Sequence, residues 1–357
     1  MDDREGDSLK PLWELRPDGE LCSPRFGDRF YTGSGTEESR AVFIEGNHLQ
    51  RRWGELRGGA DFTIVEIGFG MGLNFALAAE LWSRLQVRGR LCYCGVEGFP
   101  MERELLQKVH QNWVEELLPW SSFLLEQWPN GVSWSRGECR IELRLLTATV
   151  AEALLQLPAQ VDCWFLDGFA PEKNRAAWSA ELFREIGQRT VIGGTVATFT
   201  VAGEIRRRLQ AEGFAVKKEV GFEKKRHRLE ALKQHHWSLK EREERWENLL
   251  VEAFQQALSK GDLAAAEELL GEGVKPSAEL LHLALRHGEL AMLACLLEAG
   301  GDCNCLNSKG VPLLIEAVRR GDLSAEKLLL QQGASEELCD AKGRDAHQWR
   351  KLRQRGE

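Results

Sequence analysis

The hydrophobic pattern of this chain changes near residue 235. Before that point short apolar runs alternate with amphipathic helical segments, and after it only helical patterns occur. Five apolar runs predict strands at 62–67, 91–96, 141–146, 161–166 and 190–200. Helices are predicted at 73–85, 101–109, 177–189 and 202–212. This alternation predicts an α/β fold with a doubly wound, mostly parallel sheet, a fold that binds ligands at the carboxyl ends of its strands.

The second part of the chain repeats itself. Gly261, Gly288 and Gly321 each end a helical run and are followed by a Leu pair and a second Gly, at spacings of 27 and 33 residues. The segments resemble ankyrin repeats, whose period is about 33 residues. The shorter first spacing predicts one truncated inter-repeat loop. An unrelated bundle of helical hairpins is the alternative interpretation.

Length and composition limit the class of protein that this chain can be. A chain of 357 residues favours two domains. We divide it into an N-terminal extension (1–24), an α/β domain (25–235), a charged linker or surface helix (236–248) and helical repeats (249–350). No apolar run approaches the roughly 18 residues of a membrane span, and the first residues do not resemble a secretory signal. Nine cysteines in a chain of this length agree with reduced thiols, so we expect a cytoplasmic protein without membrane partners.

The net charge of −8 argues against a uniformly basic nucleic-acid binder. It conceals a basic stretch at 201–240, where the run Arg206–Arg208 lies. These residues could contact phosphates, or they could form an ordinary solvated helix face. The repeats are acidic, which suits a protein partner better than RNA.

A glycine-rich loop follows the first predicted strand. Glu66 lies near the end of this strand, two residues before the first of the glycines at 68, 70 and 72, and a helix is predicted to begin directly after them, near Asn74. Such glycines let the backbone turn tightly and approach a ligand. Their spacing differs from the dinucleotide pattern G-x-G-x-x-G, and the acid before the first Gly favours S-adenosylmethionine. Glu97, after the second strand, is placed to accept ribose hydroxyls. A structural turn and a surface acid are the alternatives.

Asp167 follows the apolar run 161–166 and should project from a strand's carboxyl end. A carboxylate there could orient an amine and remove its proton during methyl transfer to nitrogen. A helix cap or a turn-forming Asp would fit equally well. Phe169 and Trp178 could be pocket walls or core aromatics.

Several long motifs together carry a specific resemblance. GTEESRAVFIEGN, VEIGFGMGLNF, VEGFPM, WFLDGFAPEKN, TVATFTVAGEIRRRLQAEGF and GFEKKRH occur in this order over about 25–230. They resemble the methyltransferase domain of the bacterial MnmC family, which forms 5-methylaminomethyl-2-thiouridine in tRNA.

The resemblance implies an S-adenosylmethionine-dependent enzyme that methylates the aminomethyl nitrogen of a modified wobble uridine in tRNA. It makes Asp167 the catalytic residue. The implied cofactor-binding residues are Glu66, Gly68, Phe69, Gly70, Gly72, Asn74, Glu97, Thr149 and Asp167. The implied substrate-binding residues are Phe169, Lys173, Lys224, Lys225 and Arg226.

Some positions depart from the family pattern. Ala148-Thr149 stand where the family has Gly-Asp, Gly98 replaces a lysine, and Glu172 replaces a small residue. These departures keep two alternatives open: a methyltransferase of the same fold acting on a protein or small-molecule amine recruited by the repeats, and a catalytically weak scaffold.

Two further cofactors are not expected. No second glycine-rich βαβ pattern follows residue 240, so we predict no FAD. The pairs Cys92/Cys94 and Cys303/Cys305 lack matching ligands at zinc spacings, so we predict no metal.

Overall fold

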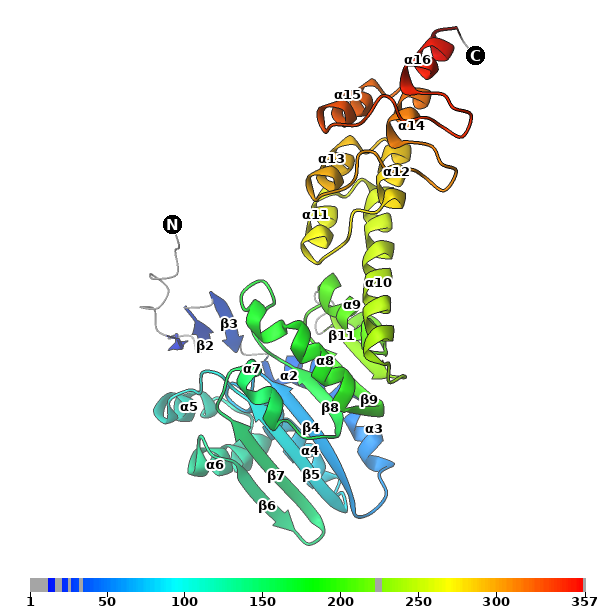
Figure 1. The fold of residues 1–357 in the computed structure, drawn as a ribbon. Coiled ribbons are helices and arrows are strands. Elements are labelled where there is room, and N and C mark those ends of the chain that lie inside the picture. The colour runs from blue at the N-terminus through cyan, green and yellow to red at the C-terminus, as the bar shows by residue number, and fades with distance from the viewer. Residues whose placement is uncertain (1–11, 17–20, 25–26, 32–34, 222–226, 356–357) are drawn as a thin grey trace. The chain divides into compact units, whose positions relative to one another are not determined.

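The computed structural model describes residues 12–16, 21–24, 27–31, 35–221 and 227–355 (Figure 1). The chain divides into two compact units, Met1–Arg242 and Glu243–Glu357. Each unit has hydrophobic core clusters of its own.

An eight-stranded sheet forms the centre of the first unit. Its strands, in spatial order, are β10 (Phe214–Val220), β11 (His227–Lys233), β9 (Thr190–Thr198), β8 (Val161–Leu166), β4 (Ala60–Ile67), β5 (Gly89–Val96), β7 (Cys139–Leu146) and β6 (Val132–Arg136). The run from β9 to β7 is parallel, whereas β11, β10 and β6 pair antiparallel. The predicted doubly wound sheet and its five strands are confirmed. The sequence pattern missed the antiparallel edge strands, because β10 carries exposed charged residues along much of its length.

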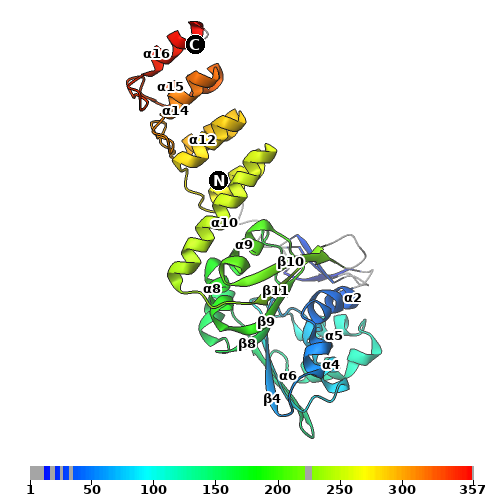
Figure 2. The same ribbon diagram turned by 90° about the vertical axis from the view of Figure 1, so that its right-hand side faces the viewer.

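Helices cover both faces of this sheet (Figures 1 and 2). They are α2 (Gly35–Ser39), the π-helix η1 (Arg40–Glu45), α3 (Leu49–Gly54), α4 (Leu73–Arg84), α5 (Arg103–His110), η2 (Glu115–Leu117), α6 (Leu118–Gln127), α7 (Val150–Ala153), η3 (Leu154–Gln156), η4 (Arg175–Trp178), α8 (Ala180–Arg189) and α9 (Gly203–Ala211). Successive strand residues serve opposite faces. Thus Ile64 packs in the cluster that contains Phe75 of α4, and Val65 packs in the cluster that contains Phe183 of α8.

The N-terminal residues form a small sheet of their own. Its strands are β1 (Glu14–Leu15), β2 (Leu21–Ser23) and β3 (Asp28–Tyr31), all antiparallel. The pairing of β2 with β3 joins residues on both sides of the predicted boundary at 24/25. The N-terminal extension is therefore not structurally separate from the first residues of the predicted α/β domain.

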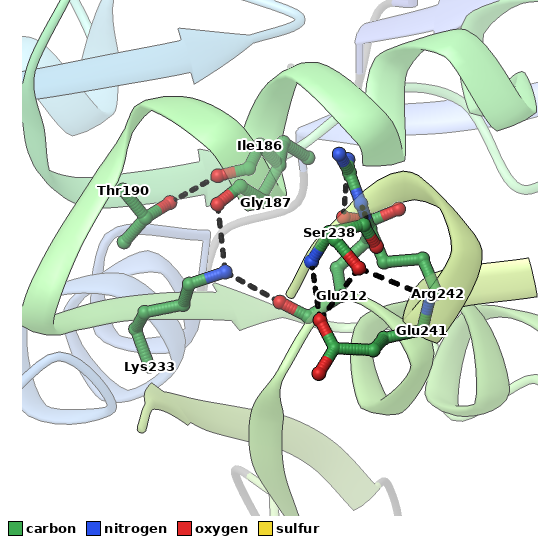
Figure 3. Close-up of polar contacts among 8 residues, drawn as sticks. All are labelled: Ile186, Gly187, Thr190, Glu212, Lys233, Ser238, Glu241 and Arg242. Atoms are coloured by element: carbon green, nitrogen blue, oxygen red, sulfur yellow. Dashed lines mark hydrogen bonds and ion pairs between the residues drawn. The ribbon is translucent and has the colours of Figure 1, made fainter. Parts of the chain in front are cut away.

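A polar network ties the last strand of the first unit to the helices beside it (Figure 3). The ammonium of Lys233 donates to the backbone carbonyls of Gly187 and Glu212. Arg242 pairs with the carboxylate of Glu212 at 3.2 Å, and Ser238 and Glu241 cap the start of α10 reciprocally. Most of the predicted linker (236–248) is helical: α10 runs over Leu239–Lys260 and passes through the boundary between the two units.

The second unit is a stack of helix pairs. After α10 come α11 (Leu263–Gly271), α12 (Ala278–His287), α13 (Leu290–Glu298), α14 (Leu313–Arg320), α15 (Leu323–Gln331) and α16 (Ala346–Arg355). Figure 1 shows α11, α13 and α15 on one side of the stack and α12 and α14 on the other. We call α11, α13 and α15 the outer helices, and the end of α10 with α12, α14 and α16 the inner helices. The loop 272–277 is shorter than the loop 299–312, which confirms the truncated inter-repeat loop.

The regular glycines end the inner helices. Gly288 and Gly321 adopt left-handed φ values of 76° and 73° as C-caps, a conformation that glycine reaches without strain. Leu269, Leu296 and Leu329, the first members of the Leu pairs, are buried in the stack's core.

Candidate functional site

The candidate site lies where three adjacent parallel strands end. The order β8–β4–β5 places the carboxyl end of β4 between its two neighbours, and the chain leaves β4 toward α4 at this point. Glu66 is near the end of β4, Glu97 follows β5, and Asp167 follows β8. Crossover connections diverge on either side of β4, which makes this the position where doubly wound sheets bind ligands.

The glycine loop is built for close backbone approach. Gly68, Gly70 and Gly72 all have positive φ, at 89°, 55° and 80°. A side-chain carbon on Gly68 would lie 2.5 Å from the backbone oxygen of Asp167. Only glycine fits there, so the loop after β4 and the loop after β8 touch through their backbones.

Asn74 joins two carboxylates. Its Nδ2 donates to Oε1 of Glu66 and to Oδ2 of Asp167, each at 2.7 Å. The hydroxyl of Tyr93 donates to the other oxygen of Glu66 at 2.7 Å. Asn74 is buried, and its Oδ1 has no hydrogen-bond partner among the described residues. A buried amide oxygen without a partner is costly, and it is a ready acceptor for an N–H donor of a ligand.

Burial dominates the protonation of these acids. It raises the pKa of Asp167 to about 8, against the hydrogen bond from Asn74 and with help from the charges of Glu38 and Glu97. It also raises the pKa of Glu66 well above its usual value, and the neighbouring Asp167 charge adds to this. Burial raises the pKa of Glu97 as well, against two backbone N–H donors. Among the described residues no ion pair is formed by these three acids, and buried acids of this kind favour a cationic ligand.

Glu97 connects the two loops beside it. Its carboxylate accepts from the backbone N–H of Gly70 at 2.7 Å and from that of Phe99 at 2.8 Å. Each carboxylate oxygen can accept a second hydrogen bond. Glu97 can therefore hold the glycine loop and still accept hydroxyl donors.

Two of the predicted cofactor-binding side chains are used elsewhere. The ring of Phe69 is buried among Phe75, Tyr93 and Trp128, so only its backbone belongs to the loop surface. Thr149 caps α7 through a reciprocal arrangement with Glu152. Its hydroxyl is thus engaged in capping.

The predicted substrate-binding residues Phe169 and Lys173 meet the N-terminal segment. The ring of Trp13 stacks on Phe169 with centroids 6.0 Å apart, and its indole N–H donates to the backbone oxygen of Phe99 at 3.2 Å. The ammonium of Lys173 donates to the backbone oxygen of Gly27 at 2.7 Å. Lys224, Lys225 and Arg226 lie outside the described residues. Trp178 is a buried core residue, and its indole donates to the oxygen of Phe169.

Sequence reasoning missed three residues of this region. Trp13 lies far from the motifs along the chain, so no spacing rule connects it to them. Tyr93 alternates with the noted cysteines on β5 and shares a face with the core, which the strand pattern alone could have shown. The Nε2–H of His110 donates to the backbone oxygen of Met71 at 2.9 Å, and Nδ1 lies 2.9 Å from the hydroxyl of Ser121. Burial lowers the pKa of His110 to about 4, so the ring is neutral, Nδ1 accepts from Ser121, and the ring supports the glycine loop.

Two of the three arginines in the basic run 206–208 are buried or ion-paired. Arg207 is buried, and Arg208 pairs with Glu204 at 2.6 Å. Within the described ranges, no group of three His, Cys, Asp or Glu side chains is arranged to hold a metal ion. No helix in the part of the chain that the structure describes has the length and apolar character to cross a membrane.

Two protein families match the chain, one in each unit. Residues 115–234 match the family of S-adenosyl-L-methionine-dependent methyltransferases designated Methyltransf_30, and residues 254–340 match three copies of the ankyrin repeat. Asp167 lies within the first match, and the glycine loop and Glu97 precede it.

Curated relatives are more specific. The chain is 40% identical over 210 residues to the tRNA 5-methylaminomethyl-2-thiouridine biosynthesis bifunctional protein MnmC of Magnetococcus marinus, covering 57% of this chain and 31% of that protein. It is 33% identical over 331 residues to the MnmC protein of Maricaulis maris, covering 86% and 52%. The resemblance to the MnmC methyltransferase domain, followed by ankyrin repeats, is confirmed. The chain spans between about a third and a half of these relatives' length.

A solved structure supports the fold. The crystal structure of MNMC2 from Aquifex aeolicus aligns with a TM-score of 0.50 at 19% identity, covering 69% of this chain and 83% of that one. This likeness concerns the fold alone.

Proposed function

We propose that this protein binds S-adenosylmethionine and methylates the aminomethyl nitrogen of a modified wobble uridine in tRNA. The observation that carries the proposal is the hydrogen-bonded network of Glu66, Asn74 and Asp167 at the ends of β4 and β8. It lies beside the glycine loop, in which Gly68 leaves no room for a side chain. The MnmC relatives supply the substrate class. Because tRNA is a cytoplasmic substrate, the proposal keeps the expectation of a cytoplasmic protein.

The site's features suit the cofactor. S-adenosylmethionine carries a sulfonium and an ammonium, and burial raises the pKa values of the acids at the strand ends, so a nearby positive charge would favour their ionised forms. Asn74 Oδ1 offers an acceptor for the ammonium, and Glu97 offers acceptors for the ribose hydroxyls. When bound, the cofactor supplies a methyl group open to nucleophilic attack.

The chain's own residues would handle the substrate amine. Asp167 Oδ1 or Oδ2 accepts an N–H of the amine and turns its lone pair toward the methyl carbon. The cofactor would supply the methyl carbon for the new N–C bond, and the electron pair of its C–S bond would leave with sulfur. The amine nitrogen then carries a surplus proton, which passes to Asp167. Asn74 holds Asp167 in place throughout.

The aromatic pair Trp13–Phe169 would receive the base. A uridine must leave its stack to reach an enzyme's reactive atoms, and aromatic rings stabilise such a displaced base by stacking. Phe169 is two residues from Asp167, and Trp13 packs on it. The N-terminal segment thus contributes a wall to the proposed substrate site.

A direct experiment combines a binding step with a transfer step. Calorimetric titration should show S-adenosylmethionine binding to the full chain. Labelled methyl should then move to tRNA that carries the aminomethyl group, and not to tRNA without it. Binding without transfer to this tRNA would overturn the substrate assignment.

A methyltransferase acting on a protein amine remains the second candidate. It is favoured by Thr149, whose hydroxyl caps α7 where the family has an acid. Methylated protein alongside unmodified RNA would support it, and absence of cofactor binding would support a scaffold role. The absence of FAD and metal, and a protein partner for the repeats, stay predictions.

A further inference from the structure

A row of basic residues follows one edge of the repeat unit. The last turn of every inner helix carries exposed basic side chains: Lys260 on α10, Arg286 and His287 on α12, Arg319 and Arg320 on α14, and Arg353 and Arg355 on α16. We call this set the basic ladder. On α12 and α14 the basic pair stands directly before Gly288 and Gly321, which end these helices, and on α10 Lys260 stands directly before Gly261.

Hydrogen bonds show that the basic ends of successive inner helices are neighbours. The guanidinium of Arg320 donates to the backbone oxygen of Arg286 at 2.8 Å, and that of Arg353 donates to the oxygen of Val318 at 3.2 Å. At the other end, a side-chain carbon on Gly261 would lie 3.2 Å from the carboxylate of Glu289, so the turns after α10 and α12 are also adjacent. At helix spacings of 8–10 Å, the ladder spans about 30 Å.

The helix dipole alone does not explain the ladder. One cation at a helix C-terminus interacts favourably with the dipole, and Arg320 and Arg353 act in this way on the preceding helix. Yet α14 and α16 each carry two arginines in their last turns. The additional arginines, Arg319 and Arg355, are exposed, and the guanidinium of Arg319 lies 4.6 Å from the ring centroid of Trp349.

The acids of the unit are mostly placed elsewhere or already engaged. Asp262 and Asp322 follow the ladder directly, and their carboxylates accept the N–H groups that open α11 and α15. Glu289 is the remaining acid of these turns. Other acids lie on the outer helices: Glu267, Glu268, Glu298 and Glu326. The unit's negative total therefore hides a basic edge.

We propose that the basic ladder binds the phosphate backbone of the tRNA substrate. This inference rests on the proposed function, because that function supplies the polyanion. Arginine is suited to phosphate through its fork of N–H donors, and an evenly spaced row of cations suits a chain of regularly spaced charges. Contacts of this kind add affinity without reading sequence. This edge of the repeats would thus hold the RNA.

The test removes ladder charges whose side chains do not cap a neighbour. Lys260→Gln, Arg286→Gln and Arg355→Gln are combined in the full chain, and Arg320 and Arg353 are kept because they donate to backbone oxygens. We expect the dissociation constant for an unmodified tRNA transcript to rise about tenfold. The slope of log affinity against log salt should fall by about 2 to 3, because about one condensed ion is released per phosphate contact.

A matched control carries the same change of charge on the inter-repeat loops: Lys275→Gln, Lys309→Gln and Lys342→Gln. We expect it to bind the transcript nearly as the parent does. Thermal unfolding and S-adenosylmethionine binding should be unchanged in both triple variants.

Two results would overturn the ladder proposal. Equal loss of tRNA affinity in both triple variants would show only a net-charge effect. Unchanged tRNA affinity, with loss of binding to polyglutamate in the ladder variant alone, would assign the edge to an acidic protein. The methyl-transfer assay separates these results from failure of the proposed function, since a parent that binds the transcript but transfers no methyl would disprove the function and leave the ladder standing.

Discussion

The two units shift the pKa values of particular acidic side chains in opposite directions. At the strand ends of the first unit, burial raises the pKa of Glu66, Glu97 and Asp167. In the repeats, hydrogen bonds to His282 and Asn307 outweigh burial and lower the pKa of Glu316. Donors from Arg344 and Trp349 lower that of Asp340 to about 2.

This difference in pKa separates acids that stabilise the fold from acids of a candidate ligand site. In the repeats these two acids have partners within the chain and contribute to stability. At the strand ends the amide nitrogen of Asn74 donates to Glu66 and Asp167, while its amide oxygen has no partner among the described residues. This arrangement costs stability until a ligand supplies charge and donors. Perturbed acids of this kind are typical of functional sites.

The largest effect should come from Asp167→Asn. Loss of a group that orients and deprotonates the amine should lower kcat about 10²- to 10⁴-fold, measured by labelled methyl transfer. Asp162→Asn is the matched control, since Asp162 lies on the same strand and its pKa is also raised by burial. Normal turnover in Asp167→Asn would remove the proposed role of this residue.

The pH dependence sharpens the contrast between the units. Because Asp167 has a pKa near 8, its ionised fraction, and with it kcat/KM, should rise about tenfold per pH unit up to about pH 8. The raised pKa of Asp167 also contributes to the free energy of unfolding. This contribution is fully present below pH 3.8, the usual pKa of Asp, and is lost as the pH rises through about 8. Asp340 acts oppositely: its contribution is present above 3.8 and is lost as the pH falls through about 2. A flat kcat/KM profile from pH 6 to 8 would contradict the assignment of Asp167.

Leu296→Ala tests whether the repeats are a separate stability unit. Leu296 is fully buried in α13, so we expect the free energy of unfolding of this unit to fall by about 2–5 kcal/mol. Methyl transfer at a permissive temperature should persist. Leu290→Ala on the same helix is the control, because Leu290 is 40% exposed and should cost no more than about 0.5 kcal/mol. Loss of cofactor binding in Leu296→Ala would show that the two units do not unfold independently.

Trp13→Ala tests the aromatic wall of the first unit. Stacking of one base on an aromatic ring contributes about 1–3 kcal/mol, so KM for tRNA should rise at least about fivefold with little change in cofactor affinity. Trp13→Phe should retain most of the affinity, although it loses the N–H donor to Phe99. A change in thermal stability without any change in KM would reduce Trp13 to a packing residue.

The smallest expected effect is Gly288→Ala. Gly288 has φ of 76° and open space around it, so an added methyl group should cost about 1 kcal/mol through backbone strain alone. Gly271→Ala, also in open space but within α11, should be neutral or stabilising. Denaturant unfolding measures both, and equal effects would show that the left-handed turn does not require glycine.

Local patterns were sufficient for most of the architecture. Apolar runs predicted the central strands, because a buried strand needs a continuous apolar segment. The recurring spacing of glycines and Leu pairs predicted the repeats, including the short loop 272–277. The pattern did not predict β10 and β11, since β10 carries exposed charged residues that resemble those of a surface loop. Asp167, Glu66 and Asn74 were identified by position and resemblance, but their hydrogen bonds to one another could not be seen in the sequence.

The sequence by itself determined that glycine follows the first strand, that acids stand at strand ends, and that helical segments recur in one register. These are properties of neighbouring residues, and periodicity records them directly. Only the tertiary structure decided that Trp13 packs on Phe169, that Thr149 caps a helix, and that the basic turns of separate repeats form one edge. Each of these depends on contacts between residues that are distant along the chain or on which of several partners a side chain selects, and both are settled by packing.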